Sequence, residues 1–389
     1  MTDASPTSAR PKAIPAIMGG IASALAPNVM PLLVATFSNS FALSPAAAGR
    51  VTAIEMLGVC TGSLLIAIFL SRASVARLMS ISLGLIIVGN LLTIAVGPQS
   101  LPLLRFIAGL GEGGGTAAMA AVLAGTATPE RFFGIFIIGT YLLGTLLFRF
   151  NPVITDAGGV LAIFWILTAL AALALPVAFL TRKAESSTVD QSGAPPARSH
   201  MIYVVIALAA MILYLTAWTN TWAYAVNIAQ WAGMDPQSTS EALGYAVVAG
   251  AAGAILAVII GPRLGDFIPM LGAGSLMISA ALLLIVQLSS STFTFAVMAW
   301  IAGMQFIGPY FLAIVSAADR EGRAASLSIA AQTLGIAIGP ALGSLVVSRG
   351  EVSLLVGVSL ALLLPSLFAL LMVERLLSRG ERHAVHSVD

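Results

Sequence analysis

The feature that most constrains this chain is a series of apolar segments, each about 20 residues long, that recurs along its length. A helix of that size crosses the ~30 Å hydrocarbon core of a lipid bilayer. The segments fall at 13–38, 46–70, 76–97, 101–126, 131–154, 158–181, 201–230, 240–263, 267–289, 292–317, 323–348 and 352–376. Because a backbone in lipid must bond to itself, the pattern predicts an all-α polytopic membrane protein with twelve transmembrane helices.

The composition excludes several other classes of protein. Of the 389 residues, 59% are hydrophobic and 9% are charged, against about 25% charged in a soluble protein. A net charge of +2, with the basic residues dispersed, gives no surface for nucleic acid. We find no catalytic, nucleotide-binding or metal-binding motif. We therefore expect no enzyme activity, no cofactor and no metal.

One hydrophilic stretch, 182–200, divides the apolar segments six from six. It is rich in serine, proline and charge, as flexible linkers are. The predicted domains are an N-terminal six-helix bundle (1–181), a cytoplasmic linker (182–200) and a C-terminal six-helix bundle with a short cytoplasmic tail (201–389). Such paired bundles are a known transporter plan.

Short matches relate the two halves. Gly49 and Gly58 recur as Gly244 and Gly253, 195 residues later. The run 106–109 (Phe-Ile-Ala-Gly) recurs as 300–303 (Trp-Ile-Ala-Gly), 194 residues later. The second match predicts that Ala299 corresponds to Arg105, and Phe306 to Glu112.

The placement of lysine and arginine predicts the orientation. With the N-terminus inside, only Arg50, Arg105, Arg149 and Arg349 of the 18 basic residues lie on the outer side or at outer helix ends. Both chain ends are then cytoplasmic. The first apolar segment is too long for the core of a signal peptide, so we expect it to be retained.

Charges inside the apolar segments are the strongest functional signal. Arg105 and Glu112 lie seven residues apart, close to two helical turns, and therefore on one face of a helix. Glu55 lies at a similar depth in the second segment. A charge at mid-membrane costs at least ~2.5–3.5 kcal/mol. Glu112, Glu55 and Arg105 are either proton-coupling residues or a structural ion-pair lock.

Polar and aromatic side chains within the segments are candidates for binding a small solute. The seventh segment is the most polar of its half, and Asn220, Tyr224 and Asn227 share one helical face. Ala26-Pro-Asn-Val-Met-Pro31 is expected to kink the first helix. The full set of candidates is Asn28, Tyr141, Arg149, Trp218, Asn220, Tyr224, Asn227, Gln305 and Gln332. Arg149 and the tryptophans have a second interpretation, as residues of the membrane interface.

Three motifs resemble the major facilitator superfamily. The family pattern Arg-x-x-x-Gly-x-Gly matches residues 105–111. The loop after the second helix resembles the family's charged loop through Arg72 and Arg77, but Ser71 replaces its aspartate. The second-half loop has Arg263 and Asp266. Residues 335–343 are similar to a glycine–proline motif that antiporters of the family carry in helix 5, although here it lies in the eleventh segment.

The resemblance implies two six-helix bundles, coupling through Arg105 and gating contacts by Arg72, Arg77, Arg263 and Asp266. We therefore expect a proton-coupled secondary transporter that works by alternating access, with a lean to uptake of a small organic anion by symport. The alternatives are efflux of drugs or amphipathic metabolites by proton antiport, and a non-transporting receptor on a transporter scaffold. The expected partners are the solute, protons and the bilayer of the plasma (inner) membrane, around a monomer.

Overall fold

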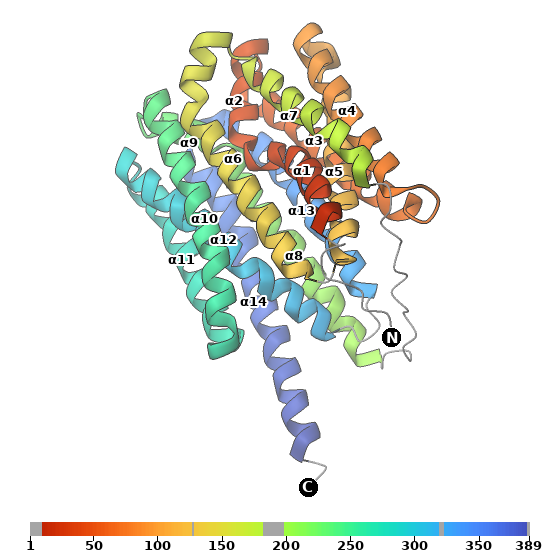
Figure 1. Cartoon of the computed structure of the whole chain (residues 1–389). Coiled ribbons are helices and arrows are strands. Elements are labelled where there is room, and N and C mark those ends of the chain that lie inside the picture. The colour runs from red at the N-terminus through yellow and green to blue at the C-terminus, as the bar shows by residue number, and fades with distance from the viewer. Residues whose placement is uncertain (1–9, 127, 182–197, 319–322, 387–389) are drawn as a thin grey trace. The chain divides into compact units, whose positions relative to one another are not determined.

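A computed structural model describes residues 10–126, 128–181, 198–318 and 323–386, and these residues form helices and short connections without a strand (Figure 1). The helices fall into two compact units, Met1–Val189 and Asp190–Asp389. The predicted all-α fold is confirmed. Residues 182–197, which make up most of the predicted linker, lie outside the described residues. The side chains from residue 378 onward also lie outside them.

Unit 1 holds the first seven α-helices. They are α1 (Arg10–Asn28), α2 (Met30–Phe41), α3 (Pro45–Phe69), α4 (Val75–Ala95), α5 (Leu101–Ala124), α6 (Pro129–Gly158) and α7 (Ala162–Ala178), with 3-10 turns η1 (Pro98–Ser100) and η2 (Phe179–Thr181). Local sequence sets two of the starts. Ser44 accepts a hydrogen bond from the Ala47 amide, and Ser74 accepts one from the Arg77 amide. These serine caps satisfy amides that have no partner within the helix.

Unit 2 begins with α8. Its helices are α8 (Arg198–Ala223), α9 (Ala225–Trp231), α10 (Pro236–Leu264), α11 (Phe267–Val286), α12 (Ser290–Ala318), α13 (Arg323–Val346) and α14 (Val352–His386), with the turn η3 (Val347–Arg349). Asp235 caps α10, with Pro236 at its first position. Helix α14 runs ten residues past the predicted end at 376.

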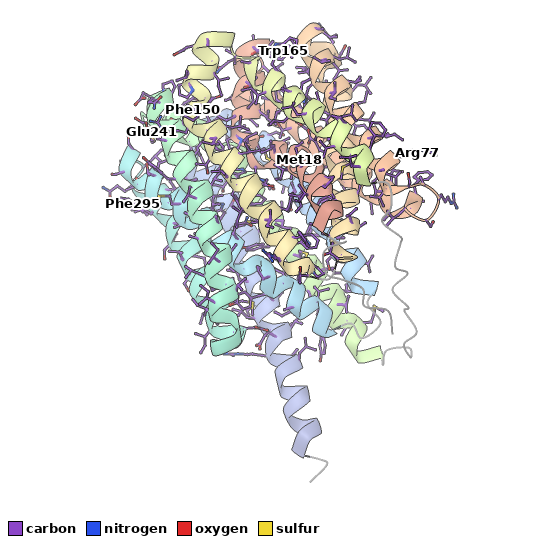
Figure 2. All side chains as sticks on the ribbon, in the orientation of Figure 1. Met18, Arg77, Phe150, Trp165, Glu241 and Phe295 are labelled. Carbon is purple, nitrogen blue, oxygen red and sulfur yellow. The ribbon has the colours of Figure 1, made fainter. Side chains whose placement is uncertain are left out.

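The described residues account for twelve apolar segments. Ten helices are long and apolar enough to cross a membrane, and α1 with α2 makes a bent pair that passes the same test. Helix α7 is apolar but shorter, at 17 residues. Large apolar side chains project from the surface, among them Trp165 and Phe295, at 54% and 69% exposed (Figure 2). Such a surface suits lipid and not water.

Two of the predicted single spans are broken. Between α1 and α2 the chain bends by 62° at Val29, as the Pro27 and Pro31 pattern predicts. The seventh span is also broken, between α8 and α9, and the single helix predicted over 201–230 is wrong. Tyr224 has φ −105° and ψ 17°, close to the −100° and 20° of Val29. No proline precedes Tyr224 in that helix, so the proline pattern that accounts for the first break does not account for the second.

Glycines hold α3 and α5 together in unit 1. Gly58 and Gly62 of α3 lie against the carbonyls of Phe106 and Leu110, and Gly109 of α5 lies against that of Glu55. The contacts advance in the same direction along both helices, so the two run parallel. A Cβ at any of these glycines would overlap a backbone atom. Small residues allow helices in lipid to approach this closely.

Unit 2 contains the equivalent helix pair, and it corrects one repeat assignment. Gly253 of α10 lies against the Ala302 carbonyl of α12, as Gly58 lies against that of Phe106. Packing therefore matches Phe106 with Ala302, two residues away from the Trp300 that the sequence match predicts. Arg105 then corresponds to Ile301 and not to Ala299. The four-letter match between the halves misjudged the register because it ignored which residue faces the neighbouring helix.

Candidate functional site

A buried ion cluster lies in the middle of unit 1. Arg105 of α5 is fully buried, and its Nη2 donates a hydrogen bond to Oε1 of Glu55 on α3, which is also fully buried. The same Nη2 lies 3.5 Å from Oε1 of Glu112, two turns further along α5. The seven-residue spacing brings Arg105 and Glu112 together within one helix. The closer partner, Glu55, comes from a helix 50 residues away in sequence.

Helix α4 supplies two further contacts that sequence analysis missed. Arg105 Nη1 donates to Asn90 Oδ1 at 2.7 Å and lies 3.5 Å from Thr93 Oγ1. Both side chains are fully buried. An asparagine inside an otherwise apolar segment was the available signal, because such a residue needs a partner in lipid. Asn90 contacts Nη1 while the two carboxyls contact Nη2, so Asn90 helps to orient the guanidinium.

Two aromatic rings cover the guanidinium. Its central carbon lies 5.0 Å from the ring centre of Phe164 on α7 and 5.9 Å from that of Phe37 on α2. The rings stack on each other at 5.8 Å. A cation over an aromatic face is attracted by the ring, more strongly when both are shielded from water. Five helices of unit 1 thus contribute to one buried ion cluster.

The charge count in this cluster is unequal. One guanidinium faces two carboxyl groups, so the cluster is neutral only when it holds one proton. Oε1 of Glu55 and Oε1 of Glu112 both lie within ion-pair distance of the same Arg105 Nη2. Glu55 Oε2, Glu112 Oε2 and Arg105 Nε are buried without a hydrogen-bond partner among the described residues. With both carboxyls ionised, the cluster carries one net negative charge.

None of the cluster contacts given above involves a candidate solute residue of unit 1. Asn28 is half-buried at the bend, and its Nδ2 donates to the Ala24 carbonyl at 3.2 Å. Tyr141 is half-buried on α6, and Arg149 is exposed near the end of the same helix.

In unit 2, two candidate solute residues hold helices together. Asn220 is fully buried, and its Nδ2 donates to the Leu355 carbonyl at 2.9 Å and to Ser359 Oγ at 2.8 Å, both on α14. The fully buried Tyr224 donates to the Pro340 carbonyl of α13 at 2.8 Å. The remaining candidates of this unit are half-buried: Trp218, Asn227, Gln305 and Gln332.

The antiporter-like motif of α13 has a packing explanation. Gly335 lies against the Ile212 carbonyl of α8, Gly339 against Thr219, and Gly343 against the ring of Tyr224. Three glycines at four-residue spacing thus let α13 follow α8 closely. The Pro340 carbonyl accepts the hydrogen bond of the Tyr224 hydroxyl, and Tyr224 is the residue at which the seventh span breaks.

The candidate gating residues occupy helix ends. Arg72 is exposed in the turn between α3 and α4, and Arg77 is exposed in the first turn of α4. Asp266 is half-buried before α11, and its partial burial raises the pKa of its carboxyl. The side chain of Arg263 lies outside the described residues. Within those residues, no group of three or more His, Cys, Asp or Glu side chains is arranged to hold a metal.

Twelve apolar segments in two units define a polytopic membrane protein. More narrowly, the chain belongs to the Major Facilitator Superfamily, whose family model matches residues 16–321. A search of curated protein sequences gives no match. The fold is similar to the crystal structure of a D-xylose–proton symporter, with a TM-score of 0.73 and 16% identity over 92% of this chain and 97% of that one.

A second similar structure is that of a bacterial homologue of the human lysosomal transporter Spinster, in an inward-facing, unoccupied conformation. It has a TM-score of 0.67 and 14% identity, over 97% of this chain and 99% of that one. At these identities the similarity establishes the fold. It agrees with secondary transport by an integral membrane protein, which is what the family membership implies.

Proposed function

We propose that this chain is a proton-coupled secondary transporter of a small organic solute, with Glu112, Glu55 and Arg105 as its proton-coupling residues. The observation that carries the proposal is the unequal charge of the buried cluster, two carboxyls against one guanidinium. A purely structural lock would be satisfied by one carboxyl. The second carboxyl gives the cluster a reason to bind a proton.

The cluster suggests how binding and release of a proton would change the ion pairing of Arg105. With one proton bound, Arg105 pairs with the ionised carboxyl and the cluster is neutral, which lowers the cost of enclosing it in a low-dielectric interior. When water reaches the cluster, the net negative state is solvated and the proton leaves. Asn90 and Thr93 keep the guanidinium in place in both states, so the carboxyls compete for a fixed cation.

For the solute, we lean to uptake of an organic anion by symport. Arg149 supplies an exposed cation on α6, and Asn28 and Tyr141 supply polar groups in the same unit. From unit 2 we keep Trp218, Asn220, Tyr224, Asn227, Gln305 and Gln332 as candidate contacts. Asn220 and Tyr224 already have intramolecular partners, so each would have to exchange one of them for the solute. We place the protein in the plasma membrane with both termini cytoplasmic.

Efflux by proton antiport is the second candidate. The observation that favours it is the aromatic character around the break between α8 and α9, where Trp218 is half-buried and its indole Nε1 has no hydrogen-bond partner among the described residues. An amphipathic cation could stack on such a ring. The glycine motif of α13 adds nothing to this candidate, since packing on α8 already accounts for it.

Purified protein in liposomes with an imposed pH gradient tests the proposal. Small carboxylic acids, sugars and cationic amphiphiles that raise thermal stability are offered outside, and a pH-sensitive dye reports the lumen. Symport acidifies the lumen as solute enters, and antiport makes it more alkaline. Binding without any solute flux would identify a receptor. If every accepted solute moves without a gradient effect, proton coupling is wrong.

The residue assignment is tested separately. Glu112→Gln and Glu55→Gln should each abolish gradient-driven accumulation while leaving solute exchange between equal concentrations. Glu351→Gln, which changes an exposed carboxyl in unit 2, is the matched control and should behave as the parent. Full coupling in both cluster variants would refute the assignment and leave the transporter class intact.

A further inference from the structure

An open apolar groove of about 330 Å³ lies on unit 1, between α3, α4 and α5. Its walls include Leu65, Phe69, Ile81 and Leu85. Leu65, Phe69 and Ile81 are 40%, 43% and 54% exposed. The groove is separate from the ion cluster, since none of the cluster residues lines it. Its volume is within the range of small-molecule sites.

Small residues on the floor create the groove. Gly62 lies directly against the Leu110 carbonyl, and Gly114 lies against the Ser82 hydroxyl. The three helices therefore approach closely at their backbones, while the long side chains of α3 and α4 stand up on either side. The groove is lined almost entirely by apolar groups and is partly open. Such a lining suits a hydrocarbon chain better than a polar solute.

One end of the groove is cationic. Arg77 lines it, and Arg72 is exposed in the turn between α3 and α4, where Figure 2 shows Arg77 at the edge of the unit. Neither arginine has a carboxylate within ion-pair distance among the described residues. The sequence has no Asp or Glu between residues 56 and 111, because Ser71 stands where the family loop has aspartate. The described side chains therefore supply no acid at this end of the groove.

We propose that this groove binds an anionic phospholipid, with one acyl chain between α3 and α4 and the phosphate on Arg77 and Arg72. Guanidinium groups bind phosphate in a bidentate manner, and basic pockets between transmembrane helices recognise acidic head groups. A zwitterionic lipid also offers phosphate, but its ammonium group would meet two arginines and no acid. The charge pattern therefore selects acidic lipids. The inference stands on the groove alone and is independent of the transport proposal.

The test measures lipid binding to the purified full chain. Phosphatidylglycerol and phosphatidylcholine with the same acyl chains are titrated into detergent-solubilised protein, and bound lipid is counted by native mass spectrometry. Phosphatidylglycerol should bind at least five-fold more tightly, and added salt should reduce the difference. Arg77→Gln and Arg72→Gln should each weaken the binding of phosphatidylglycerol about five-fold and leave the binding of phosphatidylcholine unchanged. Arg131→Gln, an exposed arginine outside the groove, should change neither.

The acyl-chain part of the proposal has its own variant. Ile81→Trp fills the groove and should weaken both lipids, whereas Val88→Trp, two turns along α4 and outside the groove, should not. Arg77→Lys keeps the charge and should restore most of the phosphatidylglycerol affinity, which separates charge from folding defects. Equal binding of the two lipids, or equal loss in Arg131→Gln, would overturn the proposal. No effect of Ile81→Trp would remove the groove as the site.

Discussion

The two units contain an equivalent pair of closely packed helices, but they bury different polar groups. In unit 1, α3 and α5 enclose Glu55, Arg105 and Glu112, the three buried charged residues of the described part of the chain. In unit 2, the equivalent pair α10 and α12 has Gly250 facing Ile301 and Gln305. The buried polar groups elsewhere in unit 2 are also neutral. Asn220 bonds to Ser359, and Tyr214 bonds to the Met304 carbonyl.

The difference shows that this helix pair does not need ions in order to pack. Close contacts between glycine and a carbonyl hold α3 against α5 and α10 against α12 alike. Buried charges are a weak source of stability, because the cost of desolvation rivals the attraction. This comparison supports the proposal that the charges of unit 1 serve proton coupling.

The largest effect should come from removing the cation. Arg105→Met leaves two buried carboxyls without a partner and should destabilise the protein by about 3–5 kcal/mol, measured by chemical unfolding in detergent. Adding Glu55→Gln and Glu112→Gln to that variant should recover most of the loss, because the site becomes neutral like its counterpart in unit 2. If the triple variant stays as unstable as the single one, unit 1 requires its charges to fold and the comparison fails.

Replacing a glycine by alanine at the equivalent helix contact should lower the stability of both units by a similar amount. Gly109→Ala and Gly253→Ala each place a Cβ against a backbone carbonyl, of Glu55 and of Ala302. Overpacking of this kind costs about 1–3 kcal/mol. Gly84→Ala on α4, where a Cβ meets nothing within 4 Å, is the control and should be neutral or slightly stabilising. Thermal denaturation of the three variants measures the effect, and a loss confined to one unit would show that the pairs are not equivalent.

Hydrogen bonds between neutral groups in unit 2 should contribute less to the free energy of unfolding than the balanced ion cluster of unit 1. Asn220→Ala removes the two hydrogen bonds to α14 and leaves the Leu355 carbonyl and Ser359 with fewer partners. The expected loss is about 1–2 kcal/mol, and it should not depend on pH because no titrating group is involved. Ser359→Ala should cost less than Asn220→Ala. A loss as large as that of Arg105→Met would place the main polar core in unit 2.

The smallest effect concerns charge at the aqueous end of unit 2. Asp235 caps α10, and hydrogen bonds from Ser238 and from the Gln237 amide lower the pKa of its carboxyl below the usual value of 3.8. Its contribution to stability is therefore present above about pH 4 and lost as the pH falls through the folded pKa. Asp235→Asn keeps a cap acceptor and should flatten this acid dependence in pH-dependent melting curves. A steeper dependence in the variant would contradict the assignment.

Local sequence was sufficient for part of the candidate site. Arg105 and Glu112 meet because both belong to one helix, where a spacing of seven fixes their faces. The first break follows from Pro27 and Pro31, since proline removes a donor and clashes with the preceding turn. The similarity to the transporter family was visible in the Arg105–Gly111 motif, and the family match confirms it.

Other parts of the site depend on how helices rotate against one another. Sequence could not indicate that Glu55 would be the closer partner of Arg105, or that Asn90 and Phe164 would complete its surroundings. The bond from Tyr224 to Pro340 and the contact of Gly253 with Ala302 are further examples, since each joins helices that are distant in sequence.

The sequence by itself determined the number, length and apolar character of the spans, because the bilayer imposes those properties on each segment separately. Only the tertiary structure decided which polar groups share a site. The reason is that the hydrophobic pattern of a helix buried in lipid is nearly uniform around its axis, so it does not specify which face turns inward. In this chain close approach at glycines makes that choice, and it brings three charges together in unit 1 and none at the matching contact of unit 2.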